Sequence, residues 1–535
     1  MSHPHILIHE MSFYLPSGKP LLNNLSVVFS SMKTGLVGKN GIGKSTLIKL
    51  INGEIQPNSG SIQLACHIAY VPQNPVILPD MTVASLLGAE EKINALHRIK
   101  QGSIDIHDYA IVNEDWDIEQ RLTKQLGYFG LVSIELERKL MHLSGGELTR
   151  LLLTNAFYSE AEFILLDEPT NHLDASMRQQ LYRAISEWPS GMMVISHDRE
   201  LLNRMDEIIE LNPSGFSHFG GNYDHYRKQK DYFLDAKEQE LHDAKKLFRK
   251  TKHSIQSTKE KHEQRQAKGE ELRRRNDQPK IMLDAMKNRS TASKGKMLTR
   301  HDRMLNQVEE NLKSAKESHI IQEIISVELP KTKVPNGKVI LAIENLAYFY
   351  PEAQSALIQD FNLRLQGAER IALSGNNGSG KTTLIKIIMK ELKPTCGKIY
   401  IGTQYVSYLD QTASLLKPHL TLVENFMLMN IDATENHAYC ALAQFLFKNT
   451  AAEQQAANLS GGEKLRALLA CTLLSDHPPQ LLILDEPTNH LDLESVESIE
   501  SALKNYQGAM IVISHDHVFL QSIGIERTIY APFTR

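Results

Sequence analysis

The sequence carries one ordered set of motifs twice, and this internal repeat limits the fold more than any other feature. The segment GKNGIGKST at Gly38 returns as GNNGSGKTT at Gly375, and LSGGE, LDEPTNHLD and ISHD follow in both copies. The histidines of the two ISHD segments, His197 and His515, lie 318 positions apart, as do the glutamates of the two LDEPT segments. The first and last thirds of the chain are therefore two copies of one domain.

Length and composition agree with at least two folded domains. The chain has 535 residues, whereas one hydrophobic core usually stops growing at about 250 to 300 residues. Its hydrophobic content of 41% and charged content of 23% are close to those of average globular proteins. No apolar run reaches about 18 residues, and the start, MSHPHILIHE, lacks a basic segment followed by an apolar one. We therefore expect a cytoplasmic protein without a transmembrane segment.

The cysteines are scattered and form no CxxC pair. This spacing predicts neither a disulfide framework nor a zinc site. We expect Cys66, Cys396, Cys440 and Cys471 to be small buried apolar residues.

The segment between the two copies, from about 223 to 318, has a different composition. It is rich in Lys, Arg, Glu and Gln, which predicts two long helices joined by a loop near 271–293. Residues 245–300 contain 18 Lys or Arg and 6 Asp or Glu, although the whole chain has a net charge of −4. A solvated helical surface is one interpretation. The basic excess favours contact with nucleic acid, since helices of mixed charge usually balance.

Each glycine-rich segment follows an apolar run and precedes a helix-forming run, as a phosphate-binding loop requires. Glycines let backbone N–H groups close around phosphates at a helix N-terminus. Lys44 and Lys381 are expected to reach the β- and γ-phosphates, and the hydroxyls of Ser45 and Thr382 to bind Mg²⁺. The predicted loop residues are Gly38, Lys39, Asn40, Gly41, Ile42, Gly43, Lys44, Ser45 and Thr46, and Gly375, Asn376, Asn377, Gly378, Ser379, Gly380, Lys381, Thr382 and Thr383.

The apolar runs FILLDE and LLILDE predict buried parallel strands that end in two carboxylates. Because side chains alternate along a strand, the two carboxylates take different roles. Asp167 and Asp485 would hold Mg²⁺, and Glu168 and Glu486 would orient or deprotonate the attacking water. Alone, such a pair could equally be a helix-capping turn. The phosphate loop in each copy favours the catalytic interpretation.

Each copy resembles an ATP-binding cassette, with LSGGE as its signature and the aspartate of NHLD as its D-loop. The resemblance implies an α/β fold in which each P-loop domain has a parallel-sheet core with antiparallel β and helical subdomains. It also implies ATP hydrolysis with ATP and Mg²⁺. By the same resemblance, Gln73 and Gln411 are Q-loop residues that sense Mg²⁺ and the water, and His197 and His515 contact the γ-phosphate.

In such cassettes the signature of one copy closes over the ATP held by the other. The resemblance therefore pairs Lys44 with Ser460 in the first ATP site and Lys381 with Ser144 in the second. Neither copy has a degenerate motif, so we expect both sites to hydrolyse ATP, and no homodimer is needed. The signature residues are Ser144, Gly145, Gly146, Ser460, Gly461 and Gly462.

The resemblance also implies an aromatic residue that stacks on adenine about 25 residues before each loop. Tyr350 is the candidate in the second copy. The first copy offers Phe13 or Tyr14, and we select Tyr14.

Two intact cassettes around a charged hairpin resemble the ABC-F family, and GNYDHYRKQK at Gly221 resembles its linker entry. The resemblance implies a ribosome partner, with ATP driving binding and release and the hairpin touching rRNA and P-site tRNA. Protection from an antibiotic is one form of that role. A helix of about 45 residues spans about 70 Å, a reach suited to an RNA-lined cleft. The candidate RNA contacts are Arg273, Arg274, Arg275, Lys280, Lys287, Arg289, Lys294 and Lys296.

The predicted domains are 1–222, 223–335 and 336–535: first cassette, hairpin and second cassette. About twenty additional residues in the first copy, near 101–120, are read as a solvated loop or helix pair rather than a specific contact surface. Two alternative functions remain: the ATPase of a transporter, docked on a separate membrane subunit, and an ATPase that acts on DNA.

Overall fold

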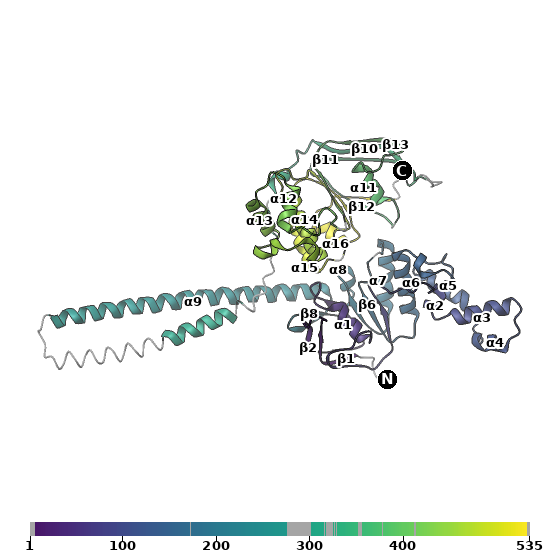
Figure 1. Ribbon diagram of the computed structural model, residues 1–535, viewed down its shortest axis with the longest axis horizontal. Helices are drawn as coiled ribbons and strands as arrows, with labels where there is room; N and C mark the ends of the chain where they lie inside the picture. The colour runs from purple at the N-terminus through teal and green to yellow at the C-terminus, as the bar shows by residue number, and fades with distance from the viewer. Residues whose placement is uncertain are drawn as a thin grey trace. The chain divides into compact units, whose positions relative to one another are not determined.

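The computed structural model describes residues 6–171, 173–274, 301–314, 316, 325, 327, 329–350, 356–376, 378–410, 413–489 and 491–531. The chain divides into two compact units (Figure 1). One comprises Met1–Asp224 and Glu323–Arg535 and contains both cassettes, and the other is His225–Gln322.

The core of the first cassette is a six-stranded sheet that is parallel except at one edge, where β8 and β9 are antiparallel. Its central strands β6 and β7 are buried on both faces, which explains their continuous apolar runs. In spatial order they are β5 (Ile68–Val71), β6 (Phe163–Asp167), β7 (Gly191–Ile195), β3 (Lys33–Val37), β8 (Glu207–Asn212) and β9 (Gly215–Gly220).

The second cassette repeats this sheet with five strands, all of them parallel to their neighbours. In spatial order they are β14 (Val406–Leu409), β15 (Leu481–Asp485), β16 (Ala509–Ile513), β12 (Arg370–Ser374) and β17 (Arg527–Tyr530). The predicted parallel-sheet core is confirmed in both copies.

A three-stranded antiparallel sheet accompanies each parallel sheet, as predicted. Buried residues alternate with exposed ones along the long strands, as Phe361, Leu363 and Leu365 do in β11, so one side of each strand lies in the core. The first of these sheets has the order β2 (Pro20–Phe29), β1 (Ile6–Tyr14) and β4 (Ser59–Leu64), and the second has the order β11 (Ile358–Gln366), β10 (Val339–Tyr348) and β13 (Cys396–Ile401).

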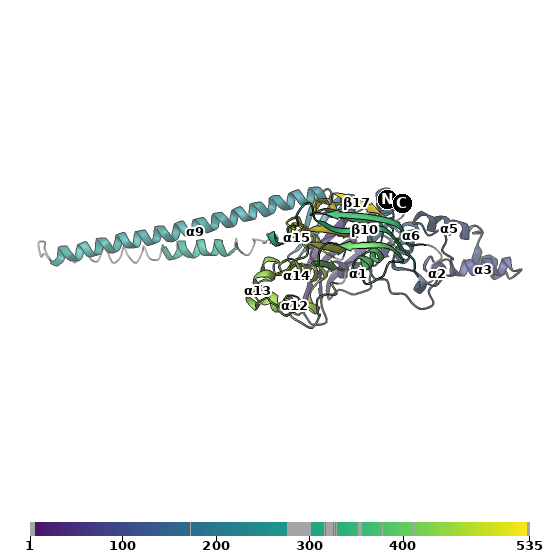
Figure 2. The same ribbon diagram turned by 90° about the horizontal axis from the view of Figure 1, so that it is seen from above.

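Helices cover the sheets and form the helical subdomains of both cassettes (Figure 2). The first cassette has α1 (Lys44–Ile51), α2 (Val83–Leu86), α3 (Glu90–Lys100), α4 (Ile106–Val112), α5 (Ile118–Tyr128), α6 (Gly145–Tyr158), α7 (Ala175–Glu187) and α8 (Arg199–Leu202). The second has α11 (Lys381–Ile388), α12 (Leu422–Met429), α13 (Glu435–Gln444), α14 (Gly461–Leu473), α15 (Leu493–Lys504) and α16 (His517–Ser522).

The additional acidic segment of the first cassette forms α4 and the start of α5, and its Val112 and Ile118 join a small apolar cluster with Ile93 and Leu96 of α3. Its acids pair with basic residues of the same helical group, because Asp108 lies 2.6 Å from the Arg98 guanidinium and Asp115 lies 2.7 Å from Arg121. The acidic composition therefore reflects local ion pairing, and a helical rather than a loop structure.

The second unit is dominated by the helix α9 (Tyr223–Arg274), which has 52 residues and continues through Gly269. Residues 301–314 form a second helix that runs alongside α9 in both views (Figures 1 and 2). At about 1.5 Å per residue, α9 is about 78 Å long. Arg273 and Arg274 end α9, whereas Arg275, Lys280, Lys287, Arg289, Lys294 and Lys296 lie outside the described residues.

The expectation of four buried cysteines is confirmed only for Cys471 and is wrong for Cys396 and Cys440. Cys396 begins β13 and Cys440 lies in α13, and both are exposed. Cys66 is half-buried and Cys471 is buried. Cysteine is small enough to be tolerated on the outer side of a strand or helix, so its apolar character alone did not decide burial.

The chain enters the second cassette before residue 336. Ile325, Val327 and Leu329 are buried in the core of that cassette, and the Ser501 hydroxyl donates to the Ile325 carbonyl at 2.7 Å. Across the described part of the chain, no helix has the length and apolar content to cross a bilayer.

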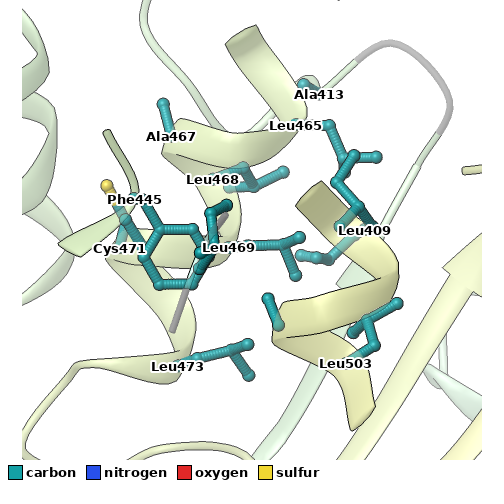
Figure 3. Close-up of a cluster of buried hydrophobic side chains, with 14 of the residues drawn as sticks. Leu409, Ala413, Phe445, Leu465, Ala467, Leu468, Leu469, Cys471, Leu473 and Leu503 are labelled. Atoms are coloured by element: carbon teal, nitrogen blue, oxygen red, sulfur yellow. The ribbon is translucent and has the colours of Figure 1, made fainter. Parts of the chain in front are cut away.

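The helical subdomain of the second cassette packs around a dense apolar cluster (Figure 3). Leu468 and Leu469 project from α14 toward Phe445 and Leu503, and the side chains of Leu468 and Phe445 are fully buried. Close packing of this kind leaves a cavity when a side chain is shortened.

Leu468→Ala should lower the free energy of unfolding by about 3 kcal/mol, through lost burial and the cavity that remains. Leu415→Ala is the matched control, because Leu415 is 44% exposed. Urea unfolding of both variants, followed by circular dichroism, measures the difference. Equal midpoints would contradict the packing described for this cluster.

Candidate active site

The sheet topology brings all the predicted catalytic segments to one edge. In the first cassette, β5, β6, β7 and β3 are parallel neighbours, so their carboxyl ends lie side by side. Asp167 at the end of β6 pairs with Ile195 at the end of β7, and Asp485 pairs with Ile513 in the same way. The phosphate loop follows β3 or β12 at the same edge, the position at which open α/β sheets bind ligands.

Each phosphate loop ends in a glycine with left-handed backbone directly before the lysine. Gly43 has φ 108° and Gly380 has φ 95°, a conformation that L-residues with a side chain rarely adopt. A Cβ on Gly43 would also lie 2.9 Å from a Leu22 methyl group. The glycines therefore allow α1 and α11 to begin directly at the lysines.

Both loop lysines are buried beneath their own loops. The Lys44 ammonium donates to the carbonyl oxygens of Gly38 at 2.5 Å and Lys39 at 3.2 Å. Lys381 does the same to Gly375 at 2.6 Å and Asn376 at 3.0 Å. Burial lowers the pKa of both lysines, and nearby carboxylates counteract it. Each loop thus holds a cation close to the carboxylates at the sheet edge.

The strand-end aspartates are largely buried beside the hydroxyl that follows each loop lysine. Burial raises the pKa of Asp167, and hydrogen bonding from Ser45 counteracts this. For Asp485, burial also raises the pKa, and Tyr408 and Thr382 counteract it. The Tyr408 hydroxyl donates to Asp485 Oδ2 at 3.1 Å.

The two glutamates have strained backbones and face the histidines of ISHD. Glu168 has φ 51° and Glu486 has φ 47°, in the left-handed region that is uncommon for residues other than glycine. Glu168 Oε1 lies 3.3 Å from His197 Nε2, and Glu486 Oε1 lies 3.4 Å from His515 Nε2. The same unusual turn in both copies aims a carboxylate and an imidazole at one point.

Burial sets the protonation of these pairs. It raises the pKa of Glu168 to about 8 and that of Glu486 to about 7. It lowers the pKa of His197 to about 3 and that of His515 to about 4. At neutral pH both imidazoles are therefore neutral, with one N–H to donate, and both glutamates titrate near the pH at which a general base works best.

Each signature serine caps the helix that follows it. Ser144 and Ser460 accept from the N–H groups of Glu147 and Glu463, whose carboxylates accept from the serine N–H and hydroxyl in return. The backbone N–H groups and dipole of Gly145 and Gly146, and of Gly461 and Gly462, therefore lie at the starts of α6 and α14. The pairing of each signature with the opposite loop stays a prediction.

Contacts within the first unit join the first phosphate loop to the second cassette. The Asn40 N–H donates to Asp492 Oδ2 at 3.0 Å, and the Lys39 ammonium lies 3.1 Å from Glu494. Asp492 also raises the pKa of Lys44 against the effect of burial. In the other direction, Asp174 raises the pKa of Lys381. The D-loop aspartate of each cassette thus acts on the loop of the other.

Of the predicted Q-loop glutamines, only Gln73 lies within the described residues. Gln73 is half-buried just beyond β5, while Gln411 and Asn377 lie outside the described residues.

Of the two aromatic residues predicted to stack on adenine, Tyr350 belongs to the second cassette. Its hydroxyl lies 3.0 Å from the hydroxyl of Thr383 in α11. Tyr14 ends β1 and is 41% exposed, and its neighbour Phe13 packs against the core. The choice of Tyr14 as the adenine-stacking residue stays a prediction.

Sequence reasoning missed several residues around the site. Tyr70 and Tyr408 occupy equivalent positions near Asp167 and Asp485. The repeat could have revealed both tyrosines, because each lies three residues before the Q-loop glutamine, in IAYVPQ and VSYLDQ. Arg178, which lines a pocket with Glu168 and His197, was also missed, because the second copy has no arginine at the equivalent position.

The fold and this arrangement define a protein with two ATP-binding cassettes. The family model of the ABC transporter matches residues 22–171 and 358–489, more than half of the chain. The solved structure of RNase-L Inhibitor has the same fold, with a TM-score of 0.57 and 21% identity over 97% of this chain and 87% of that one. Archaeal ribosome recycling factor aABCE1, solved with the ribosomal stalk protein aP1, has a TM-score of 0.58 and 21% identity over 98% and 88%. The chain is an ATPase of the ATP-binding-cassette type.

Comparison with sequence relatives shows to which family of ATP-binding-cassette proteins the chain belongs. The ATP-binding protein Uup of Buchnera aphidicola (strain APS) is 31% identical over 527 residues, 97% of this chain and 79% of that protein. ABC transporter F family member 5 of Arabidopsis thaliana is 28% identical over 524 residues, 92% of this chain and 70% of that protein. The chain belongs to the ABC-F family.

The described residues fit Mg²⁺ together with ATP. ATP-binding-cassette domains in general bind ATP with Mg²⁺, and this ion prefers carboxylate, hydroxyl and phosphate oxygens. Asp167 Oδ1 is buried without a hydrogen-bond partner, and Ser45 lies beside that carboxylate. Among the described side chains, no cluster of three or more His, Cys, Asp or Glu could hold a metal ion alone. The donor set therefore suits an ion that arrives with phosphates.

The elevated pKa values predict that ATP turnover rises with pH. A glutamate with a pKa of about 7 to 8 is mostly protonated at pH 6 and cannot accept a proton from water. We expect kcat to increase about tenfold between pH 6 and pH 8.5 and then to level off. Steady-state ATPase assays at constant ionic strength measure this profile, with Glu168→Gln/Glu486→Gln as the inactive control. A flat profile would count against these glutamates as bases.

Proposed function

We propose that this ABC-F ATPase closes its two cassettes on ATP, binds the ribosome in the closed state and leaves after hydrolysis. The observation that carries the ribosome part is a strongly basic, exposed stretch of α9. Between residues 245 and 261 there are seven Lys or Arg and a single acidic residue, and all of them are exposed. These basic residues are Lys245, Lys246, Arg249, Lys250, Lys252, Lys259 and Lys261.

Like charges in this stretch lie one helical turn apart. Lys245 precedes Arg249 by four positions, and Lys246 precedes Lys250 by four, so both pairs repel each other on the helix surface. The N-terminal part of α9 behaves differently, since Arg227 pairs with Asp231 at 3.2 Å. Uncompensated repulsion costs stability in the free helix. A polyanion such as RNA relieves it and releases counterions.

ATP supplies the energy for closure. In this proposal Lys44 and Lys381 bind the β- and γ-phosphates, and the γ-phosphate draws each loop toward the opposite signature. The cross-cassette contacts of Asn40 and Lys39 with Asp492 and Glu494 support it, because they already join a loop to the opposite D-loop. A bound Mg²⁺, held by Ser45 or Thr382 and the strand-end aspartates, would neutralise phosphate charge.

Hydrolysis then opens the cassettes. Glu168 and Glu486 accept a proton from the attacking water, and the neutral His197 and His515 donate to the γ-phosphate. Loss of that phosphate removes the link between each loop and the opposite signature. The fold shared with archaeal ribosome recycling factor aABCE1 supports a ribosomal role only as a likeness of architecture. Membership of the ABC-F family and the basic stretch of α9 are the stronger support for a ribosomal role.

Glu168→Gln with Glu486→Gln should trap the protein on its target, because Gln keeps the shape of the side chain and loses its basicity. We expect turnover to fall at least a hundredfold, ATP still to bind, and the variant to co-sediment with ribosomes in ATP and inhibit translation. The matched control is Lys44→Ala with Lys381→Ala, which should neither bind ATP nor be trapped. A trapped variant that ignores ribosomes but binds DNA or a membrane subunit would overturn the translational role.

Charge reversal on α9 tests RNA contact separately. Arg249→Glu with Lys250→Glu should weaken ribosome association and flatten its salt dependence, since each lost phosphate contact removes counterion release. ATP turnover without ribosomes should stay the same. Lys228→Glu, at an exposed position of the acidic N-terminal part, is the control. An unaltered salt slope would make the basic stretch a solvated surface.

A further inference from the structure

The second cassette has an open groove of about 670 Å³ that is separate from its ATP site. Tyr405 and Gln480, which line it, directly precede β14 and β15 and therefore lie at the amino ends of these parallel strands. The phosphate loop and the strand-end carboxylates lie at the carboxyl ends. The groove is thus at the opposite edge of the sheet. Its lining residues include Lys338, Lys390, Tyr400, Thr403, Tyr405 and Gln480.

Two lysines give this groove a positive charge. Lys338 directly precedes β10, and its ammonium donates to Gln480 Oε1 at 2.7 Å, which fixes the cation to the wall of the groove. Lys390 follows the end of α11 and is exposed. None of the described residues that line the groove is acidic. An anion is therefore the ligand that the charge of the groove favours.

Lys390 has a backbone conformation that favours glycine. Its φ is 63°, and Gly53, the equivalent residue of the first cassette, has φ 77°. The two are equivalent because each follows the lysine of its phosphate loop by nine positions. Glycine adopts this left-handed backbone without the steric cost that a Cβ brings. The second cassette thus has a lysine where glycine would be more stable, which points to a use for its charge.

An aromatic ring lies in the same groove and faces solvent. Tyr400 belongs to β13 and is 61% exposed, although most of a tyrosine ring is apolar. Tyr405 forms another part of the wall, and its ring stacks on His477 with the centroids 5.3 Å apart. An exposed ring beside ammonium groups matches the base and the phosphate of a nucleotide.

The turn between β13 and β14 holds these groups in place. The Gly402 N–H donates to the Ile340 carbonyl at 2.9 Å, and a Cβ on Gly402 would lie 1.9 Å from the Val339 oxygen. Thr403 Oγ1 accepts from the Tyr405 N–H at 3.1 Å. The Thr403 hydroxyl hydrogen can still be donated to a ligand.

The first cassette differs at the positions that give the groove its chemistry. Gly53, Gln63 and Glu162 are its equivalents of Lys390, Tyr400 and Gln480. It therefore has neither the cation nor the ring at these positions, and it has a carboxylate in place of the amide. The site belongs to the second cassette alone, so the repeated ATP chemistry does not account for it.

We propose that this groove binds an unpaired nucleotide of single-stranded RNA, with the base stacked on Tyr400 and the phosphate held by Lys338 and Lys390. Its exposed walls favour a chain that continues past the site, since a pocket for a free small molecule encloses most of its ligand. The Thr403 hydroxyl supplies a hydrogen bond for the ribose 2′-hydroxyl, which DNA lacks. The inference stands apart from the ribosomal proposal, because RNA contact by α9 requires none of these residues.

Fluorescence anisotropy with labelled hexauridylate tests the stacking in the full-length protein. The background is Arg249→Glu with Lys250→Glu, which weakens RNA contact by α9, and excess ATP keeps the ATP sites occupied. Tyr400→Ala should raise Kd about tenfold, because one base loses its stacking partner. Tyr400→Phe keeps the ring and should stay within about twofold. Gln63→Ala, at the equivalent position of the first cassette, is the control that should leave Kd unchanged.

Lys390→Gly tests the charge without a cost to folding, because glycine is the residue that this backbone favours. It should raise Kd about threefold and lower the slope of log Kd against log salt concentration by about 0.7, the value for one phosphate contact with a single strand. Lys124→Ala removes an exposed lysine of α5 and should change neither quantity. ATP turnover should be the same in all these variants.

The remaining outcomes separate the possible ligands. Irradiation of a 4-thiouridine oligonucleotide should crosslink it to the peptide that contains Tyr400, and crosslinks confined to other peptides would overturn the site. Unchanged Kd in both Tyr400→Ala and Lys390→Gly would do the same. If uridine monophosphate competes as well as hexauridylate, the groove is a site for a free nucleotide and the RNA assignment is wrong. Equal affinity for the deoxyribose oligonucleotide would also contradict the RNA assignment.

Discussion

The structure depends on buried carboxylates at the carboxyl edge of each parallel sheet, held beside a loop lysine. Burial raises the pKa of Asp167 and Glu168, and the nearby Lys44 counteracts it by favouring their ionised forms. The lysine is in turn desolvated and hydrogen bonded to carbonyls of its own loop. This mutual dependence is costly without a ligand of high charge density. The strained glutamate backbones and the left-handed glycines recur at this edge in both copies.

Charged residues of each cassette also interact with residues of the other cassette. Each D-loop aspartate acts on the opposite loop lysine, and the Arg199 guanidinium lies 2.9 Å from Glu500 of the second cassette, with both side chains at most 10% exposed. Removing one partner of a buried pair leaves an uncompensated charge. The electrostatics of each ATP site therefore depend on charged residues of the opposite cassette.

Most of the fold and much of the candidate site could be predicted because the motifs are local. A buried strand, a glycine loop and a helix start form one continuous segment, so GKNGIGKST and FILLDE indicate their own structures. The helical insertion, with its exposed basic stretch, followed from composition in the same way. The exposed positions of Cys396 and Cys440 could not be predicted, since a single small residue does not reveal which side of its element faces solvent.

The sequence by itself determined that two equivalent cassettes exist and that each has a phosphate loop and a buried strand that ends in two carboxylates, because these motifs are local and occur twice. Only the tertiary structure decided which residues approach each site from elsewhere. Asn40 and Asp492 are separated by 452 positions, and no local pattern links them. Contacts between surfaces distant in sequence depend on how complete domains pack, and that packing is a property of the folded chain.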